Sequence, residues 1–301
     1  MNINYMKPIF KLSTLILSVA TLMSCGGNDD DREVQTTLTL NTFNLGELPN
    51  NAEYEAWLVS NGENISLGKF NGNASEKTFR VSLERADAAT QFLISIEPGN
   101  DPSGEISNTI LLSGPFSGNS ASLNINNAIA NLSGISGAYT LMTPTDNNSS
   151  NEQSGFYFYN PTSGTAALNL PTLPDGWMYE GWVTLPKQGG GTVNLSTGKF
   201  TSPEGRDEFD GYSSNTNTSP SFPGEDFLST QFLSLQGVST PVDIRGKKVF
   251  ISIEPATDPD ELTPFYIQPL INNLTGQDLA PAMNTMTVNS ASFPQGVVIK
   301  E

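Results

Sequence analysis

The sequence predicts an all-β protein made of two tandem antiparallel β-sandwich domains of the Ig-like class. Three observations predict this fold. Short apolar segments alternate in polarity with a period of two, as strands with one buried face do. Proline and Asn-Gly turn signals bound these segments, and convincing helical periodicity is absent. Three sequence blocks of the first half recur in the same order in the second half, so one module is expected twice.

The repeated blocks are the first strands that the sequence defines. In the block at 54–58, Tyr54, Ala56 and Leu58 alternate with Glu55 and Trp57, which gives two distinct faces. The block at 92–98 is apolar at nearly every position, as in a strand buried on both sides, and its proline ends the strand. The paired blocks are YEAWL (54–58) and YEGWV (179–183), LGKF (67–70) and TGKF (197–200), and FLISIEP (92–98) and VFISIEP (249–255).

The spacing of the blocks gives the domain organisation. The offset between copies grows from the first block to the last, so the second copy carries insertions. A stretch at 128–137 is a plausible linker, and 139–142 and 155–159 are expected to be early strands of the second copy. We therefore divide the chain into a signal peptide (1–24), an acidic tether (25–32), a first β-sandwich domain (33–132) and a second β-sandwich domain with insertions (138–301).

The N-terminal segment has the features of a lipoprotein signal. Lys7 and Lys11 precede a mostly apolar run at 12–23, which is too short to span a bilayer. The run ends in Leu-Met-Ser-Cys, which resembles a lipobox, so Cys25 is expected to be the lipid attachment site after cleavage. The acidic run at 29–31 resembles the surface-export signal of Bacteroidetes lipoproteins. The expected location is therefore extracytoplasmic, on the outer membrane and anchored by the N-terminal lipid.

Composition excludes several classes of function. The formal net charge of −17, without a basic cluster, argues against nucleic-acid binding. The chain contains no histidine, which removes Ser-His-Asp triads and imidazole-ligated metals. Cys25 is the only cysteine, so neither an intramolecular disulfide nor a thiolate cluster can form. We expect no cofactor, no metal ion and no catalytic residues; paired carboxylates or an oxygen-only metal site are the chemistry that composition still allows.

The repeated motifs resemble a known family. Tyr-x-x-Trp followed by Gly-x-Phe and an Ile-Ser-Ile-Glu-Pro strand is similar to the C-terminal extracytoplasmic domain of anti-sigma-K factors, and both copies have this pattern. The resemblance implies a β-rich fold and an envelope setting. An anti-sigma factor binds its sigma factor through a cytoplasmic domain and signals through a transmembrane helix. Cleavage at Cys25 leaves neither of them, so direct sigma-factor binding is not expected.

Two glutamates are the most conspicuous charged candidates. Glu97 and Glu254 each end an apolar strand, just before a proline. One interpretation makes them catalytic carboxylates, or calcium ligands together with Asp101 and Asp258. The other interpretation, which we favour, is structural: they accept backbone N–H bonds from the following turn, at a strand end open to water.

Aromatic residues offer a candidate ligand surface. Trp57 and Trp182 are expected to pack in or near the core rather than stack on sugars. Exposed Tyr157 and Tyr159, opposite Phe156 and Phe158, would suit binding. The insertion at 202–224 is a long loop rich in Ser, Asn, Gly and Pro, and such loops are often functional. The candidate ligand surface consists of Tyr212, Phe222 and Phe227.

Several functions stay open at this point. The leading hypothesis is a non-catalytic envelope lipoprotein whose two domains bind a partner or sense the state of the envelope. The first rival is a glycan-binding surface lipoprotein. An enzyme, as an all-carboxylate glycosidase, comes third, and direct anti-sigma activity comes last.

Overall fold

The structure is a computed structural model that describes residues 33–301, except 73–74, 100–103, 216–219, 259 and 273–279. Residues 34–301 form one compact unit. The predicted signal peptide, the acidic tether and the lipid site Cys25 lie outside the described residues. The described part is all-β, with two large antiparallel sheets, which confirms the all-β, antiparallel part of the predicted fold class.

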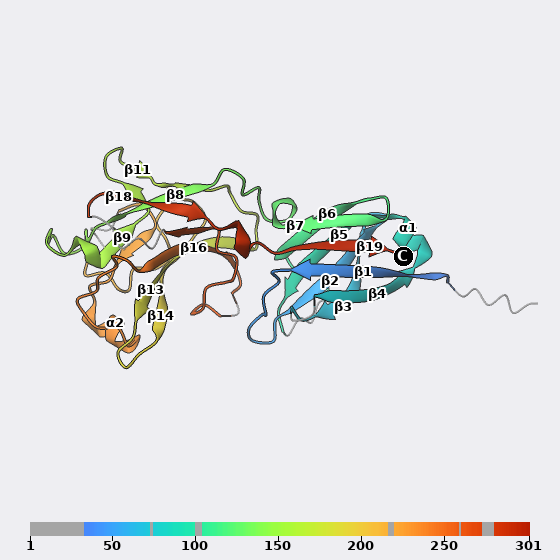
Figure 1. Cartoon of the computed structure of the whole chain (residues 1–301), viewed down its shortest axis with the longest axis horizontal. Helices are drawn as coiled ribbons and strands as arrows, with labels where there is room; N and C mark the ends of the chain where they lie inside the picture. Colours follow the sequence, from blue (N-terminus) through green and yellow to red (C-terminus); the bar gives the residue numbers. More distant parts are fainter. Residues whose placement is uncertain (1–32, 73–74, 100–103, 216–219, 259, 273–279) are drawn as a thin grey trace, which may run out of the picture. The chain divides into compact units, whose positions relative to one another are not determined.

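The first sheet contains eight strands in the order β3-β2-β5-β6-β7-β19-β1-β4 (Figure 1). Every neighbouring pair is antiparallel. A short helix, α1 (Leu83–Asp87), precedes β5, and a 3₁₀ turn, η1 (Ile125–Asn127), follows β7. The strands are β1 (Gln35–Phe43), β2 (Glu53–Ser60), β3 (Glu63–Phe70), β4 (Glu76–Ser82), β5 (Ala89–Glu97), β6 (Ile110–Ser117), β7 (Ser120–Asn124) and β19 (Gln295–Lys300).

This sheet is continuous, whereas the prediction was a sandwich of two separate sheets. Its two end strands approach each other through aromatic side chains: Phe70 of β3 and Phe79 of β4 have ring centroids 6.3 Å apart. Phe79 is also 6.3 Å from Phe92 of the central strand β5. The sheet therefore curls into a barrel-like form around an aromatic core. Alternating polarity predicts one buried face per strand, but it does not distinguish a curled sheet from two stacked sheets.

The last strand of the chain lies inside the first sheet. Figure 1 shows β19 in red among the blue and green strands of the N-terminal half. Val298 is fully buried and pairs with Leu40 of β1 on one side and Ala121 of β7 on the other. The alternation of its residues puts Val297 and Ile299 on the outer face. The predicted division into consecutive modules therefore does not hold for β19, because pairing between distant strands is not visible in local sequence.

The second sheet contains nine strands in the order β14-β13-β16-β17-β18-β8-β9-β15, with β12 paired to β8. A separate two-stranded sheet is formed by β10 and β11, and α2 (Thr230–Leu235), η2 (Glu152–Ser154) and η4 (Ser290–Ser292) are short helical turns. The strands are β8 (Ser136–Leu141), β9 (Gly155–Tyr157), β10 (Tyr159–Asn160), β11 (Thr165–Ala166), β12 (Leu168–Asn169), β13 (Trp177–Pro186), β14 (Thr192–Phe200), β15 (Gly224–Asp226), β16 (Lys248–Pro255), β17 (Leu270–Asn272) and β18 (Met283–Val288).

Each large sheet contains the same three-stranded unit, which is β3-β2-β5 in the first sheet and β14-β13-β16 in the second. Tyr54 pairs with Phe70 and Ile96, and Tyr179 pairs with Phe200 and Ile253. A register shift follows Ala56 in one unit and Gly181, at the same position, in the other. The predicted strand blocks therefore have equivalent pairing partners in the two halves of the chain.

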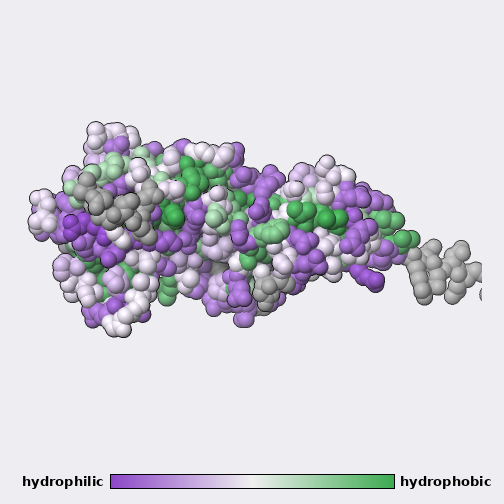
Figure 2. All heavy atoms as spheres, viewed as in Figure 1, coloured by the Kyte–Doolittle hydropathy of each residue, from purple (hydrophilic) through white to green (hydrophobic). Residues whose placement is uncertain are grey.

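The core is rich in aromatic and branched aliphatic side chains, and the surface is polar. Tyr54, Tyr179, Phe92 and Phe250 are among the largest buried side chains. Hydrophilic and mildly hydrophobic residues cover most of the face in Figure 2, as expected for a chain with a net charge of −17. The polar and charged side chains that are buried in this core, among them Glu55, Glu97, Glu180 and Glu254, are the unusual feature of the fold.

Candidate functional site

Each three-stranded unit buries a chain of polar side chains within the sheet. In the first unit, Trp57 Nε1 donates a hydrogen bond to Ser95 Oγ over 2.8 Å. The Ser95 hydroxyl donates in turn to the Glu97 carboxylate. Hydrogen bonds of this kind compensate the cost of placing polar atoms in an apolar core. The equivalent residues in the second unit, with the same two bonds, are Trp182, Ser252 and Glu254.

The two strand-end glutamates are bound by the chain that follows them, as the structural interpretation predicted. Glu97 Oε1 accepts a hydrogen bond from Ser107 N over 3.1 Å, and Glu254 Oε1 accepts one from Phe265 N over 2.8 Å. The expectation that these strand ends are open to water was wrong. Glu97 is 1% exposed and Glu254 is 0% exposed, because the following loop folds back over each carboxylate.

A second pair of glutamates comes from the central strands β2 and β13. Ser66 donates to Glu55 in the first unit, and Ser196 donates to Glu180 in the second. Both glutamates are nearly fully buried, at 4% and 3% exposure. In each of them Oε2 has no hydrogen-bond partner. Each unit therefore buries two carboxylates, one from the central strand and one from the end of the neighbouring strand.

In the second unit a third carboxylate joins this pair. One oxygen each of Glu180, Glu254 and Asp258 lies within 4.8 Å of the other two. Asp258 also forms a salt bridge with Lys199, with Oδ2 and Nζ 3.2 Å apart. Glu254 Oε2, like Glu180 Oε2, has no hydrogen-bond partner. These three carboxylates, with oxygen ligands only, are the residues of the described structure that could hold a metal ion.

The surroundings of this cluster favour protonated or neutralised carboxylates. Burial raises the pKa of Glu254 to about 8, and repulsion from Glu180 and Asp258 acts in the same direction. Burial also raises the pKa of Glu180 to about 7, although its bond from Ser196 and the nearby Lys199 ammonium oppose the shift. Negative charge is therefore costly at this place unless a cation balances it.

The Glu180 side chain lies at the wall of a pocket in the second module. The pocket has a volume of about 450 Å³ and opens to the surface. Its rim carries two exposed apolar side chains, Phe209 (39% exposed) and Leu262 (80% exposed). Phe209 belongs to the predicted insertion. The other polar lining residues include Asn194, Ser196, Lys199, Glu208, Gln236 and Glu261.

The structure separates the three aromatic residues of the predicted ligand surface. Tyr212 lines this pocket, but it is only 8% exposed and packs against Phe209 and Phe227. Phe227 is 1% exposed and stacks on Phe156, so it is a core residue and not part of a surface. Phe222 stacks on Tyr159, with ring centroids 4.9 Å apart. The insertion uses its aromatic residues mainly to attach itself to the sheet.

The remaining aromatic candidates are buried. Trp57 and Trp182 are 3% and 1% exposed, which confirms the expectation that they pack in the core. Tyr157, expected on an exposed face opposite Phe156 and Phe158, is 1% exposed. Tyr159 alone of these tyrosines is half-buried. All three residues of β9 are buried, and β15 pairs along one edge of this strand.

A further acidic cluster lies where the insertion meets β15. Burial raises the pKa of Glu225 to about 9, and the neighbouring Asp226 and Asp207 add repulsion. Burial raises the pKa of Asp207 to about 8, against the bond that its carboxylate accepts from Gly224 N over 2.7 Å. Ser213 donates to both Glu225 and Asp226. This cluster connects the insertion to the sheet through buried hydrogen bonds.

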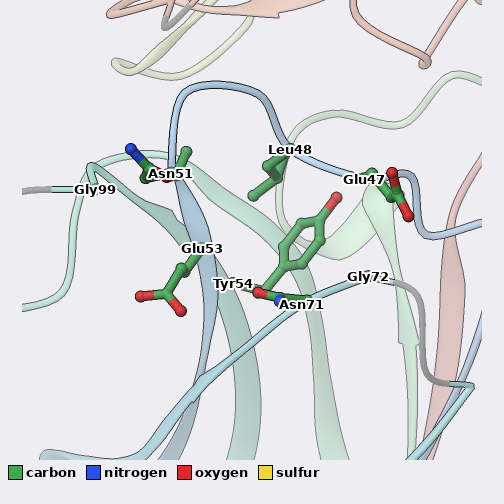
Figure 3. A pocket seen from close by; sticks show the side chains of 9 residues that line it. Glu47, Leu48, Asn51, Glu53, Tyr54, Asn71, Gly72 and Gly99 are labelled. Carbon is green, nitrogen blue, oxygen red and sulfur yellow. The ribbon is translucent and has the colours of Figure 1, made fainter.

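The first module has a pocket of its own, with a volume of about 520 Å³ (Figure 3). The Tyr54 ring points toward Leu48 at its wall, whereas the Glu53 carboxylate points away from the ring. The Tyr54 hydroxyl donates to Gly46 O over 2.7 Å and lies 3.1 Å from the Tyr266 hydroxyl. Its polar end is therefore already bonded within the protein.

The central-strand glutamates and Lys199 are residues of the candidate site that the sequence did not single out. A signal for them existed. With a period of two, Glu55 lies on the same strand face as Trp57, and the second copy repeats both residues. A repeated glutamate beside a repeated core tryptophan indicates a buried carboxylate. That the Asp258 loop returns to this carboxylate is visible only in the folded chain.

Comparison with known proteins identifies part of the chain. Residues 31–106 match the family model described as anti-sigma-K factor rskA, C-terminal. The match covers the three-stranded unit of the first module, so this region is similar to an anti-sigma-factor domain that lies outside the cytoplasm in its parent family. No curated protein and no solved structure matches the chain.

Two observations bear on the predicted extracytoplasmic location. None of the helices in the described ranges is both long and apolar enough to cross a membrane. The family match in the first module is consistent with an extracytoplasmic setting. The lipid attachment expected at Cys25 falls on residues that the structure does not describe.

Proposed function

We propose that the protein is a non-catalytic, lipid-anchored envelope protein whose two modules act as a binding or sensory unit. The observation that carries the proposal is the match of residues 31–106 to the extracytoplasmic domain of anti-sigma-K factors. The resemblance to that domain implies no catalytic residue in this chain. The proposed role is therefore to hold a partner outside the cytoplasm.

The second module is proposed to be a second copy of this domain. Equivalent pairings of Tyr54 and Tyr179, and equivalent bonds from Trp57 and Trp182 to serine, support this proposal. Chance similarity of a few strand residues would not extend to the same register shift and the same buried hydrogen bonds. Two copies on one chain would give a partner two related surfaces.

The proposed lack of catalytic activity is supported by the burial of the strand-end glutamates Glu97 and Glu254. A glycosidase of the paired-carboxylate kind needs two carboxylates on either side of an accessible bond. Glu97 and Glu254 instead lie beneath their loops, each bonded to a serine and a backbone N–H. Hydrolysis of aryl glycosides by the purified protein, lost on Glu97→Gln or Glu254→Gln, would contradict this part of the proposal.

Membrane attachment is tested through Cys25. Cells that express the protein are fed an alkyne fatty acid, and the protein should become labelled and remain with the outer-membrane fraction. The Cys25→Ser variant should lose the label and leave the membrane fraction, while Ser24→Ala should keep both. An unlabelled wild-type protein would overturn the anchor.

Partner binding is tested by cross-linking in intact cells. The anchored protein should capture an envelope component, and no sigma factor should be recovered, because the modules lie on the other side of the inner membrane. Recovery of a sigma factor would overturn the proposed topology.

The alternative is a glycan-binding surface lipoprotein, and one observation favours it. The pocket of the second module combines exposed Phe209 with amide side chains of Asn194 and Gln236. An aromatic face with amide hydrogen-bond groups suits a sugar ring. A glycan array with residues 33–301 should give no signal under the leading proposal. A signal that Phe209→Ala removes would favour the alternative.

A further inference from the structure

The cluster of Glu180, Glu254 and Asp258 has unused bonding capacity. Glu180 Oε1 accepts from Ser196, and Glu254 Oε1 accepts from Ser252 and from Phe265 N. Oε2 of each glutamate accepts no hydrogen bond, although both side chains are more than nine-tenths buried. Buried carboxylate oxygens without a partner are costly, because they have lost water and gained nothing in exchange.

The charges of the cluster do not balance either. Lys199 supplies one positive charge, through its bond to Asp258, against three carboxylates that lie within reach of one another. When all three are ionised, two negative charges remain. A divalent cation would neutralise them and would give the unpaired oxygens a ligand at the same time.

The spacing of the oxygens fits a calcium ion. Two oxygens that share one Ca²⁺ ion can be no farther apart than twice the metal–oxygen distance, which is about 4.8 Å. The three oxygens here lie within 4.8 Å of one another. Carboxylates without nitrogen or sulfur ligands also favour hard cations over zinc or copper.

An ion could reach this cluster from outside. Glu180 and Lys199 line the pocket of the second module, together with Glu261 on its rim. Negative charge at the pocket wall attracts cations, and the remaining coordination positions of a bound ion could be filled by water from the pocket. Glu254 is fully buried, and one of its oxygens lies within 4.8 Å of one oxygen of Glu180 and one of Asp258.

From these observations we propose that Glu180, Glu254 and Asp258 bind a Ca²⁺ ion beside the pocket of the second module, which Glu180 lines. This inference departs from the expectation of no metal ion and uses the oxygen-only metal site that composition still allowed. The missing ligand is Glu180, which lies 74 residues before Glu254 and joins it only through strand pairing. The proposal is independent of the proposed partner-binding role.

Calcium binding is tested on the purified full-length protein in detergent. The protein is stripped with a chelator, and the melting temperature Tm is measured with and without CaCl₂. Calcium at about 100 times its Kd should raise Tm by about 5 to 10 °C. Isothermal titration calorimetry with CaCl₂ and with MgCl₂ gives the affinities directly. No heat and no Tm rise with millimolar Ca²⁺, or tighter binding of Mg²⁺, would overturn the proposal.

Charge-neutral variants locate the ion. Glu254→Gln and Asp258→Asn keep the size of the side chain and should weaken calcium binding at least as much as loss of an outer-shell partner does, about 10- to 100-fold. Glu208→Gln is the matched control, because Glu208 lines the same pocket but is exposed and outside the cluster. Asp258 is less deeply buried than Glu254, so its variant remains informative if Glu254→Gln does not fold. Equal weakening by Glu208→Gln would overturn the site.

Discussion

The two three-stranded units share their buried polar bonds but differ in what covers them. In the first unit, Gly68 of β3 has a φ of +114° and open space beside it. In the second unit, Gly198 has a φ of +112°, but a side chain there would meet Phe209 N at 2.6 Å. The difference arises from the insertion of the second module, whose Glu208 N donates to Lys199 O over 2.9 Å.

The two units share one set of buried hydrogen bonds, whereas the pocket beside Glu180 occurs in the second unit with its insertion. The strand pairing, the tryptophan–serine bond and the serine–glutamate bond need no insertion, because the first unit has them as well. The pocket beside Glu180 needs Phe209 and Tyr212, which only the insertion supplies. In the second unit the insertion therefore makes Glu180, one member of the buried acidic pair, part of a pocket wall.

The largest expected effect tests whether the two units have equivalent cores. Trp57→Ala and Trp182→Ala should each lower the free energy of unfolding by about 3 to 5 kcal/mol, since each removes a buried ring and leaves a cavity. Urea unfolding followed by circular dichroism measures both losses. Losses that differ by more than about 2 kcal/mol would show that the units are not energetically equivalent.

The next prediction concerns the contact between the insertion and β14 at Gly198. Gly68→Ala should cost about 1 to 2 kcal/mol, because a residue with a Cβ is strained at positive φ. Gly198→Ala has the same strain and must also displace the Phe209 backbone, which should add about 1 to 3 kcal/mol. The comparison of their urea midpoints isolates the contribution of the insertion. Equal costs would mean that the insertion does not rest on β14.

Individual strands could be predicted from the sequence, but their pairing over long distances in the chain could not. The repeated blocks correctly predicted β2, β5, β13 and β16, because alternating and continuous apolar patterns are local properties. The position of β19 between β1 and β7 could not be predicted, because any strand with that alternation could fill it. A continuous curled sheet also requires the approach of Phe70 to Phe79, which is a long-range contact.

The candidate site was predicted less completely, for a related reason. Glu254 and Asp258 were recognised as possible oxygen ligands because they lie close in sequence. Glu180 joins them across the β13–β16 ladder, and Lys199 joins them across β13–β14. Conversely, aromatic residues of a polar loop suggested a surface, whereas Phe227 was buried because loops also need apolar residues to attach themselves.

A pH effect on stability is expected from the acidic cluster of Glu225 and Asp207, in addition to that of Glu180 and Glu254. The pKa of Glu225 is raised to about 9 in the folded protein, against about 4.3 in an unfolded chain, so the folded state binds more protons between these values. The free energy of unfolding should therefore fall as pH rises from about 5 to 9, by up to about 1.4 kcal/mol per pH unit. Asp207, with a pKa raised to about 8, contributes in the same direction up to that pH.

The variant Glu225→Gln should reduce the slope of this pH dependence, because one of the carboxyl groups with a raised pKa can no longer titrate. Urea midpoints measured from pH 5 to pH 9 give the slope for each protein. Glu84→Gln, an exposed change on α1 of the first module, should leave the slope unaltered. A wild-type stability that increases with pH over this range would contradict the assignment of a buried, protonated Glu225.

The smallest expected effect concerns the short helices that precede β5 and β16. Ser82 begins α1, and its hydroxyl oxygen accepts a hydrogen bond from Arg85 N over 3.4 Å. Ser229 begins α2 without a side-chain capping bond. Ser82→Ala should therefore cost about 0.5 to 1 kcal/mol, at the low end for a cap because the bond is long, and Ser229→Ala should cost less than that. Paired thermal melts would measure the difference, and an equal or larger loss at Ser229 would mean that α2 is capped in solution in a way that α1 is not.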